Sequence, residues 1–365
     1  MNVRLRRVLL VGIVVLFVAA AGLGCAKDKP KDQASSAPAP QAPVLAKTLN
    51  VYNWSDYLPE DIIREFEQEF GVKVNYDTYA SNEELLAKLQ MGASGYDLVF
   101  PSDYMVEIMV QLNLLEPLNH NNIPNAKHLD PNFLNLPFDQ GNKYSLPYLW
   151  GTTGLAVNTA KVAEEITSWE ELWNPKYKGK IALLNDSRET LGLVLKTLGY
   201  SLNTTNQEEL QNAKKKLHSL LPSIKAFDSE NMKNMMVSGE VWLAHAYVGD
   251  VMMAAEENED LVYVLPKEGG VIWADNLAIP KGAPHKYTAE VFINFLLRPE
   301  ISARIAEEIL YGTPNAAAKE LIDPEIAGNP AIYPPEEILA KCEWLQDVGE
   351  ATKLYDRIWT EVKGY

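Results

Sequence analysis

The alternation of apolar strands and amphipathic helices after Thr48 constrains the fold of this chain more than any other feature. The pattern predicts a strand from Thr48, a helix from Pro59 that ends at Gly71, and a second strand directly after it. Ser81 opens a capping box for a second helix, and residues 96–100 form a short apolar run that is typical of a buried parallel strand. This order of elements predicts an α/β lobe with a parallel sheet.

A similar order begins again in the second half of the chain. Residues 180–184 form another short apolar run, and residues 208–221 favour a long helix. With 365 residues, 47% of them hydrophobic, the chain is long enough to build a large core in two lobes. Two α/β lobes without a long disordered linker between them predict a cleft, and ligands of such folds bind at the carboxyl ends of the strands.

The net charge of the chain indicates which classes of ligand it can bind. The sequence has 33 Lys and Arg residues against 49 Asp and Glu residues, which gives a formal net charge of −16. Nucleic-acid binding needs a cationic surface that displaces counterions, so this balance argues against a nucleic-acid partner. An acidic surface is instead compatible with cationic ligands.

The N-terminus predicts export. Residues 1–24 combine three arginines, an apolar stretch at 8–21 and small residues after it, which is the pattern of a signal peptide. Residues 22–25, Gly-Leu-Gly-Cys, resemble the lipobox of bacterial lipoproteins, although Leu23 stands two positions before Cys25 and lipoboxes usually carry Leu three positions before it. We expect Cys25 to become the lipidated first residue of the mature chain. The alternative is an uncleaved single-span anchor, which leaves the exported protein on the same membrane.

The segment after the signal predicts a tether, and the cysteine content predicts no disulfide. Residues 25–46 are rich in Pro, Ala, Ser and Lys without apolar periodicity, a composition typical of a flexible connection. Cys25 and Cys342 are the two cysteines of the chain. Because a lipidated Cys25 has no thiol left to pair, we predict that Cys342 is a lone buried thiol.

Two chemical kinds of residue follow the apolar runs, where the strands are predicted to end. Aromatic faces cover methylene chains and attract cations, and carboxylates accept charge-assisted hydrogen bonds from ammonium groups. Together they predict a slot for a long, flexible alkyl polycation. The aromatic residues are Trp54, Tyr57, Tyr104, Tyr247, Trp273 and Tyr311, and the acidic residues are Asp56, Asp186, Glu189, Asp250 and Asp275.

Each of these residues also has a purely structural interpretation. Tryptophan and tyrosine near strand ends often pack in the core or at its rim. An aspartate after a strand commonly caps the next helix, and Asp186 followed by Glu189 fits capping geometry. The recurrence of both kinds at several strand ends favours a ligand site, but the pattern alone leaves both interpretations open.

Several long blocks, in one order along the chain, closely resemble the spermidine/putrescine-binding proteins of bacterial ABC transporters. The similarity runs from about residue 47 to the C-terminus, and such a set is far more specific than one short motif. The blocks are YNWSDY at 52–57, YDLVFPSDY at 96–104, SLPYLWGTTGLAVN at 145–158, SWEELWNPKYKGKI at 168–181, PKEGGVIWADNLAIP at 266–280, INFLLRPE at 293–300 and EWLQDVG at 343–349.

The resemblance implies a periplasmic-binding-protein fold, in which two α/β lobes joined by crossing strands close around a polyamine. It implies a monomer, in the periplasm or on the outer face of the cell membrane, that delivers polyamine to the transmembrane subunits of an ABC permease. After the predicted signal at 1–24 and tether at 25–46, it divides the rest of the chain into a first lobe of 47–152 and 275–320 and a second lobe of 153–274 and 321–365.

The resemblance assigns ligand contacts by motif. The first lobe supplies Trp54, Ser55, Tyr57, Ser102 and Tyr104, the second lobe Asp186, Glu189 and Ser229, and the hinge region Trp273, Asp275 and Tyr311.

Departures from the family pattern leave the choice of polyamine open. Tyr247 stands where the family usually has Trp, and Leu345 stands where spermidine-preferring members have Gln. Residues typical of both branches occur: the Ser55–Asp56 pair and Asp250 resemble the putrescine-preferring branch, whereas Tyr104, Asp186 and Trp273 resemble the spermidine-preferring one.

Two other functions remain as alternatives. A hydrolase acting on polysaccharide could use Asp186 and Glu189 as paired cleft carboxylates, but no nucleophile elbow, Walker loop, dinucleotide fingerprint or HExxH sequence occurs. A receptor of the same fold could take another solute, such as a sugar or a ferric ion, which would need amide and Arg donors or clustered Tyr and His ligands. The histidines are scattered without metal-ligand spacing. We therefore expect no catalytic residue, cofactor or metal.

Overall fold

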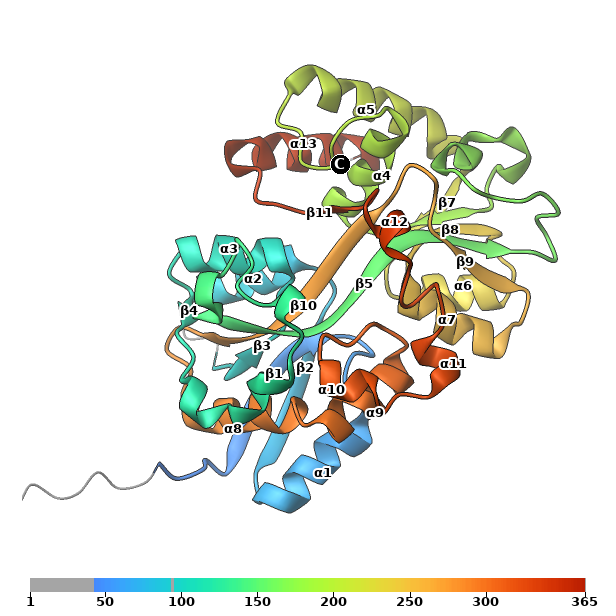
Figure 1. The fold of residues 1–365 in the computed structure, drawn as a ribbon. Coiled ribbons are helices and arrows are strands. Elements are labelled where there is room, and N and C mark those ends of the chain that lie inside the picture. The colour runs from blue at the N-terminus through green and yellow to red at the C-terminus, as the bar shows by residue number, and fades with distance from the viewer. Residues whose placement is uncertain (1–42, 93–94, 365) are drawn as a thin grey trace, which may run out of the picture. The chain divides into compact units, whose positions relative to one another are not determined.

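The computed structural model describes residues 43–92 and 95–364 (Figure 1). The predicted signal, Cys25 and the tether up to residue 42 lie outside this part of the chain. The α-helices are α1 (Glu60–Phe70), α2 (Asn82–Gln90), α3 (Asp103–Gln111), α4 (Ser187–Thr197), α5 (Gln207–Leu220), α6 (Met232–Val237), α7 (Val248–Glu257), α8 (Lys286–Leu296), α9 (Pro299–Ile309), α10 (Ala316–Lys319), α11 (Pro324–Ala327), α12 (Glu336–Leu339) and α13 (Thr352–Lys363).

The strands of the described residues join into one mixed sheet in the order β2-β1-β3-β10-β5-β8-β6-β7. The short strands β4 and β11 pair with β10, and β9 pairs with β5. The strands are β1 (Thr48–Trp54), β2 (Lys73–Tyr79), β3 (Leu98–Val99), β4 (Leu115–Glu116), β5 (Ser145–Asn158), β6 (Ile181–Leu183), β7 (Ile224–Phe227), β8 (Leu243–Tyr247), β9 (Leu261–Val264), β10 (Val271–Pro280) and β11 (Glu343–Trp344).

The first lobe is built on β1, with β2 and β3 parallel to it on its two sides. Leu49 and Val51 of β1 are fully buried. Phe66 of α1 packs against Phe292 and Phe295 of α8, with ring centroids 4.6 and 5.4 Å apart. Because β1 and β3 run in one direction, the residues that follow them lie at the same edge of the sheet.

The second lobe is built on β6, which lies between β7 and β8 and runs parallel to both. Helices α4, α5 and α13 pack together over one apolar cluster, in which Trp169, Tyr177 and Tyr355 are fully buried. A second cluster includes Met232 of α6 and Val251 of α7. The carboxyl ends of β6, β7 and β8 all point to the same side of this lobe.

Strands β5 and β10 run antiparallel to each other and connect the two lobes (Figure 1). Every residue of both strands is buried. Their register shifts between Asp275 and Asn276. This arrangement confirms the predicted α/β class with two lobes joined by crossing strands.

Local sequence signals match the observed ends of the helices. Helix α1 begins after Pro59 and ends at Gly71, which adopts a left-handed φ of 67° and donates its N–H to the carbonyl of Glu67. At α2, the Ser81 hydroxyl accepts a hydrogen bond from the backbone N–H of Glu84 at 3.2 Å. These predictions are confirmed because each rests on a cap whose chemistry is local.

Cys342 differs from its prediction. It is half-buried rather than buried, because it precedes the two-residue strand β11 at the margin of an apolar cluster. Its partial burial raises the pKa of the thiol. In the ranges 43–92 and 95–364, no helix has both the length and the apolar composition that crossing a bilayer requires.

Candidate functional site

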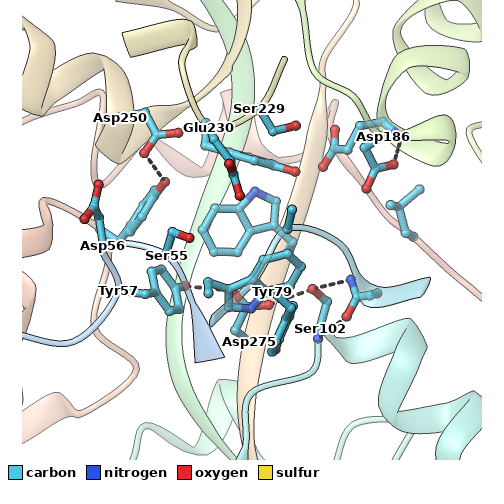
Figure 2. Close-up of a pocket in the computed structure, with 18 of the residues that line it drawn as sticks. Ser55, Asp56, Tyr57, Tyr79, Ser102, Asp186, Ser229, Glu230, Asp250 and Asp275 are labelled. Carbon is cyan, nitrogen blue, oxygen red and sulfur yellow. Dashed lines mark hydrogen bonds between the residues drawn. The ribbon is translucent and has the colours of Figure 1, made fainter. Parts of the chain in front are cut away.

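Every residue predicted from the sequence to contact a ligand lines one cavity of about 270 Å³ (Figure 2). The cavity opens where the carboxyl ends of strands from both lobes meet, as expected for α/β folds. The predicted residues on its wall are Trp54, Ser55, Asp56, Tyr57, Ser102, Tyr104, Asp186, Glu189, Ser229, Tyr247, Asp250, Trp273, Asp275 and Tyr311.

Asp275 of β10 is a buried carboxylate of the cavity that is held by two hydroxyl groups. The Tyr57 hydroxyl donates to its Oδ2 at 2.7 Å, and the Ser102 hydroxyl donates to its Oδ1 at 2.6 Å. Asp275 is 5% exposed, and burial raises the pKa of its carboxyl to about 7 although both hydroxyls oppose the shift. The group is therefore poised to ionise when a cation enters the cavity.

The local backbone explains how Asp275 meets residues from a distant part of the sequence. The regular pairing of β10 with β5 is interrupted by the register shift beside Asp275. An isolated bridge joins Asp275 to Ser102, the residue before α3. Asn82 then holds Ser102 on both sides: its Nδ2 donates to the Ser102 hydroxyl at 3.0 Å, and its Oδ1 accepts from the Ser102 N–H at 3.1 Å. This double contact fixes the direction of the hydroxyl toward Asp275.

An aromatic wall surrounds this carboxylate. Trp273 packs edge to face against Tyr311 and Tyr247, with centroids 5.1 and 5.8 Å apart, and Tyr311 packs in the same way against Tyr57 at 5.7 Å. The Trp273 Nε1–H donates to the Thr153 hydroxyl at 3.2 Å. Because edge-to-face packing and this hydrogen bond fix the rings, their faces are preorganised for methylene groups and cations.

Two further aromatic residues are held at the first lobe's side of the cavity. The Trp54 Nε1–H donates to the carbonyl of Phe100 at 2.9 Å, and the Tyr104 hydroxyl donates to Glu83 Oε1 at 3.2 Å. The guanidinium of Arg188, from the second lobe, lies 5.8 Å from the centroid of the Tyr104 ring. Tyr104 therefore contacts both lobes.

Asp186 has both of the roles that its sequence position suggested. It caps α4, and its Oδ1 accepts hydrogen bonds from the backbone N–H groups of Arg188 and Glu189 at 2.8 and 2.9 Å. It also lines the cavity (Figure 2). Burial raises the pKa of its carboxyl, which means that burial disfavours the ionised form. A cationic ligand in the cavity would stabilise that form.

Glu189 is 4% exposed and has one carboxylate oxygen without a hydrogen-bond partner among the described residues. Its Oε1 accepts from the Thr153 hydroxyl at 3.0 Å, whereas Oε2 is buried and unpaired. His245 Nε2 lies 3.7 Å from Oε2, and burial lowers the pKa of this imidazole to about 3. Burial, followed by the charge of Asp186, raises the pKa of Glu189 well above its usual range. A cationic donor from the cavity would satisfy the free oxygen.

Asp250 and Asp56 occupy another side of the cavity (Figure 2). The Tyr311 hydroxyl lies 3.4 Å from Asp250 Oδ1, and burial raises the pKa of this carboxyl to about 6. Asp56 is exposed and lies in the turn after β1, with a φ of 50°. Two predicted serines remain: Ser55 is exposed and precedes Asp56 in the turn after β1, and Ser229 follows β7 and accepts a hydrogen bond from the Asn185 N–H at 2.9 Å.

The cavity also contains residues that the sequence interpretation missed. Asp103 is 2% exposed, and its Oδ2 has no hydrogen-bond partner among the described residues. Its position in the PSDY block, between Ser102 and Tyr104, was a signal that could have identified it. Lys233 lies on α6, where no motif marks it. The other additional lining residues are Tyr79, Ala80, Asn82 and Glu230. Leu345, whose position the family resemblance had marked, lines the cavity as well.

The chemistry of this wall favours a slender cation with several amine groups. Carboxylates outnumber basic groups on it, and Asp103, Glu189 and Asp275 are at most 5% exposed. Burying several carboxylates together is unfavourable unless cations pair with them. Among residues 43–92 and 95–364, no group of three or more His, Cys, Asp and Glu side chains is arranged to hold a metal ion.

Comparisons with known proteins agree with this chemistry. A family described as bacterial extracellular solute-binding protein matches residues 61–334. The chain is 42% identical over 318 residues to the spermidine/putrescine-binding periplasmic protein of Salmonella typhimurium, covering 87% of this chain and 91% of that protein. It is 35% identical over 339 residues to the putrescine-binding periplasmic protein PotF of Escherichia coli, with coverage of 87% and 91%.

A solved structure shares the fold. The spermidine/putrescine ABC transporter substrate-binding protein PotD of Streptococcus pneumoniae matches with a TM-score of 0.75 and 38% identity, covering 87% of this chain and 99% of that one. The two lobes and their crossing strands thus form the periplasmic-binding-protein fold. Because the family match spans most of the described residues and full-length relatives share more than a third of their sequence with it, the chain belongs to the bacterial extracellular solute-binding proteins.

Proposed function

We propose that this protein is an extracytoplasmic receptor that captures spermidine or putrescine and delivers it to an ABC permease. Its relatives that bind spermidine or putrescine, and the related ABC transporter protein of Streptococcus pneumoniae, support the substrate class and the transporter. The observation that carries the proposal is the contact set of Asp275, a buried carboxylate held by Tyr57 and Ser102 in a cavity that Trp273 also lines. This combination suits an ammonium group followed by methylenes.

The two lobes supply different contacts to one amine chain. Trp54 and Tyr104 come from the first lobe and Asp186 and Glu189 from the second, while Asp275 lies on a crossing strand. Only a closed arrangement lets both sets contact the same ligand, so polyamine shifts an open–closed equilibrium toward the closed state. We divide the lobes at 47–152 with 275–320, and 153–274 with 321–365.

In this proposal the protein acts as a binding component and not as an enzyme. Asp186, one member of the carboxylate pair that a hydrolase would use, has its Oδ1 engaged by two backbone N–H groups of α4. Such a carboxylate is suited to fix an ammonium group rather than to exchange protons with a substrate.

Export, lipid anchoring and the monomeric state also belong to the proposal. The extracellular family and the periplasmic relatives support export. Lipid on Cys25 would hold the receptor close to its permease. Replacing Cys25 with Ser should move the mature protein from the membrane fraction to the soluble fraction, and equal membrane retention of both forms would contradict lipidation at this residue.

Titration calorimetry tests the proposed function directly. Spermidine and putrescine should each bind with one site per protein and raise the melting temperature, whereas an oligosaccharide should do neither. Absence of heat and of a melting shift with both amines would reject the proposal. Light scattering of the same sample measures the mass, and a dimer would contradict the monomeric state.

A further inference from the structure

One basic side chain, Lys233, lies among the described residues that line the cavity. It belongs to α6 of the second lobe, and its Nζ lies 3.7 Å from Asp56 Oδ2 of the first lobe. The Lys233 side chain is 25% exposed, so it is neither a free surface group nor a buried one. A cation at this place competes with a cationic ligand for the same carboxylates.

The position of Lys233 divides the cavity electrostatically. Asp56 and Asp250 lie on one side of the cavity, and Asp186 lies on the other (Figure 2). Lys233 is close enough to Asp250 for its charge to oppose the effect of burial on that carboxyl. The Asp56–Asp250 side therefore has a cation from the protein itself.

On the Asp186 side, two carboxylates lack part of their hydrogen bonding within the described part of the chain. There, Glu189 Oε2 and Asp103 Oδ2 are buried without hydrogen-bond partners among the described residues. Arg188 lies nearby, and its charge opposes the effect of burial on Asp186 and Glu189, but unlike Lys233 it does not line the cavity. Its terminal N–H groups donate to Gln346 O and Asn203 Oδ1, each at 3.0 Å. Glu189 and Asp103 therefore line the cavity while each retains one buried oxygen without a hydrogen bond from the residues that the structure describes.

We propose that Lys233 is a specificity-determining residue whose ammonium group serves as a built-in cation at the Asp56–Asp250 side. A bound polyamine then places its own ammonium groups on Asp275 and toward the Asp186 side. Lys233 thereby limits how many charged amines the cavity accepts. This inference rests on the proposed polyamine function and adds the residue that sets the preferred length and charge of the ligand.

Replacing Lys233 with Met tests the role of the charge while keeping an unbranched apolar stem. Without the ammonium group, Asp56 and Asp250 lose their partner, and the repulsion against an incoming amine disappears. Ligands with more charged amines should gain most. Because placing like charges close together opposes binding, the ratio of the putrescine dissociation constant to that of spermine, a tetraamine, should increase by about tenfold or more.

A matched control uses Lys225, which pairs with Glu240 at 2.9 Å on the same lobe and does not line the cavity. The Lys225→Met variant should keep the wild-type ratio. The double variant Lys233→Met with Asp250→Asn should return the ratio toward that of the wild type, because it removes the uncompensated carboxylate together with the cation. A ratio that stays as high as in Lys233→Met would show that shape rather than charge is responsible, and would overturn the proposal.

The experiment measures putrescine, spermidine and spermine by calorimetry at one salt concentration, with the melting temperature of each ligand-free variant as a check on folding. If wild type binds polyamines and Lys233→Met keeps the same ratio within about threefold, the role of Lys233 is rejected and the proposed function stands. If wild type binds none of the three amines, the proposed function itself fails. If Lys233→Met does not fold, the variant Lys233→Gln carries the same expected change in ratio and the same rejecting outcome.

Discussion

Gly151 of β5 lies opposite Trp273 of β10, so close that a Cβ atom on Gly151 would be 2.8 Å from Trp273 Cζ2. The same Cβ would lie 3.2 Å from Tyr311 Cδ1. Real Cβ atoms essentially never come as close as 2.8 Å to another atom, so the absence of a side chain at Gly151 lets the Trp273 ring occupy its place, with Tyr311 packed tightly beside it.

Replacing Gly151 with Ala should therefore weaken polyamine binding by displacing Trp273 toward the cavity. Overpacking a tight site costs about 1–3 kcal/mol. If the displaced ring blocks the ligand, so that the bound state bears this cost, it corresponds to a loss of about fivefold or more in affinity. Gly192→Ala is the matched control, because its nearest neighbour would be the flexible end of Leu202 at 3.2 Å. Calorimetry on both variants checks the difference, and equal affinities would refute this account of Gly151.

Neutralising Asp275 should cost more affinity than neutralising any other carboxylate of the cavity. Removing one partner of a desolvated charged hydrogen bond costs about 2–5 kcal/mol, so Asp275→Asn should weaken binding by at least about thirtyfold. Asp260→Asn, at an exposed position outside the cavity, serves as the control. An Asp275→Asn variant that binds within about threefold of wild type would place the critical carboxylate elsewhere.

Trp273→Ala should lose more affinity than Trp273→Phe. Phenylalanine retains an aromatic face for methylenes and a weaker cation–π contact, whereas alanine retains neither. Both variants lose the Nε1–H that donates to Thr153. Comparing their dissociation constants isolates the contribution of the ring face, and equal losses would mean that Trp273 acts only through packing and this hydrogen bond.

Binding should weaken as the pH falls, because an ammonium ligand needs the ionised form of Asp275. With a pKa of about 7 in the empty cavity, this carboxyl is mostly protonated at pH 5.5, so affinity should fall by roughly thirtyfold between pH 8 and pH 5.5. At pH 7, binding should also release about half a proton from Asp275. Calorimetry in buffers of different ionisation enthalpy measures this release, and proton uptake on binding would contradict the prediction.

The stability of the empty protein should change in the opposite direction. Burial raises the pKa of Asp275 above its unfolded value, so between about pH 4 and pH 7 the folded protein holds a proton that the unfolded chain has released. This contribution to stability is present at low pH and is lost as the pH rises through about 7. The contribution of Asp275 is measured by comparing how the melting temperature changes with pH in the wild type and in Asp275→Asn.

Spermidine should bind more tightly than putrescine. A triamine compensates more of the buried carboxylates than a diamine, and carboxylates left unpaired in one cavity are costly. Against this, Leu345 lines the cavity where an amide would accept from a terminal amine, and Lys233 already compensates one side. Titrations at one ionic strength decide the order. A putrescine dissociation constant equal to or below that of spermidine would show that these two residues outweigh the number of acids.

Much of the fold and of the site could be predicted because its signals are local or repeated. Gly71 marks the end of α1 because it adopts a left-handed conformation, and Ser81 marks the start of α2 because its side chain caps the helix. Asp186 could be recognised as a cap because it directly precedes α4. The carboxyl ends of parallel strands had to meet, so residues after those strands could be grouped without knowing any distance.

Other features depend on contacts between distant parts of the chain. The bond between Ser102 and Asp275 joins residues 173 positions apart and requires the register shift in β10, which no local pattern encodes. Lys233 enters the cavity because the second lobe brings α6 to face Asp56. Cys342 is only half-buried because β11 is short and lies at the margin of its cluster.

The location of Asp275 on a crossing strand has a kinetic consequence. A residue on β10 belongs to the connection between the lobes, so it can contact the ligand before the lobes close, whereas Asp186 and Glu189 approach only with the second lobe. Loss of a late contact leaves the first encounter unchanged and shortens the residence time of the bound molecule. We therefore expect substitutions at Glu189 to act mainly on the dissociation rate, and those at Asp275 to act on the earlier step of capture as well.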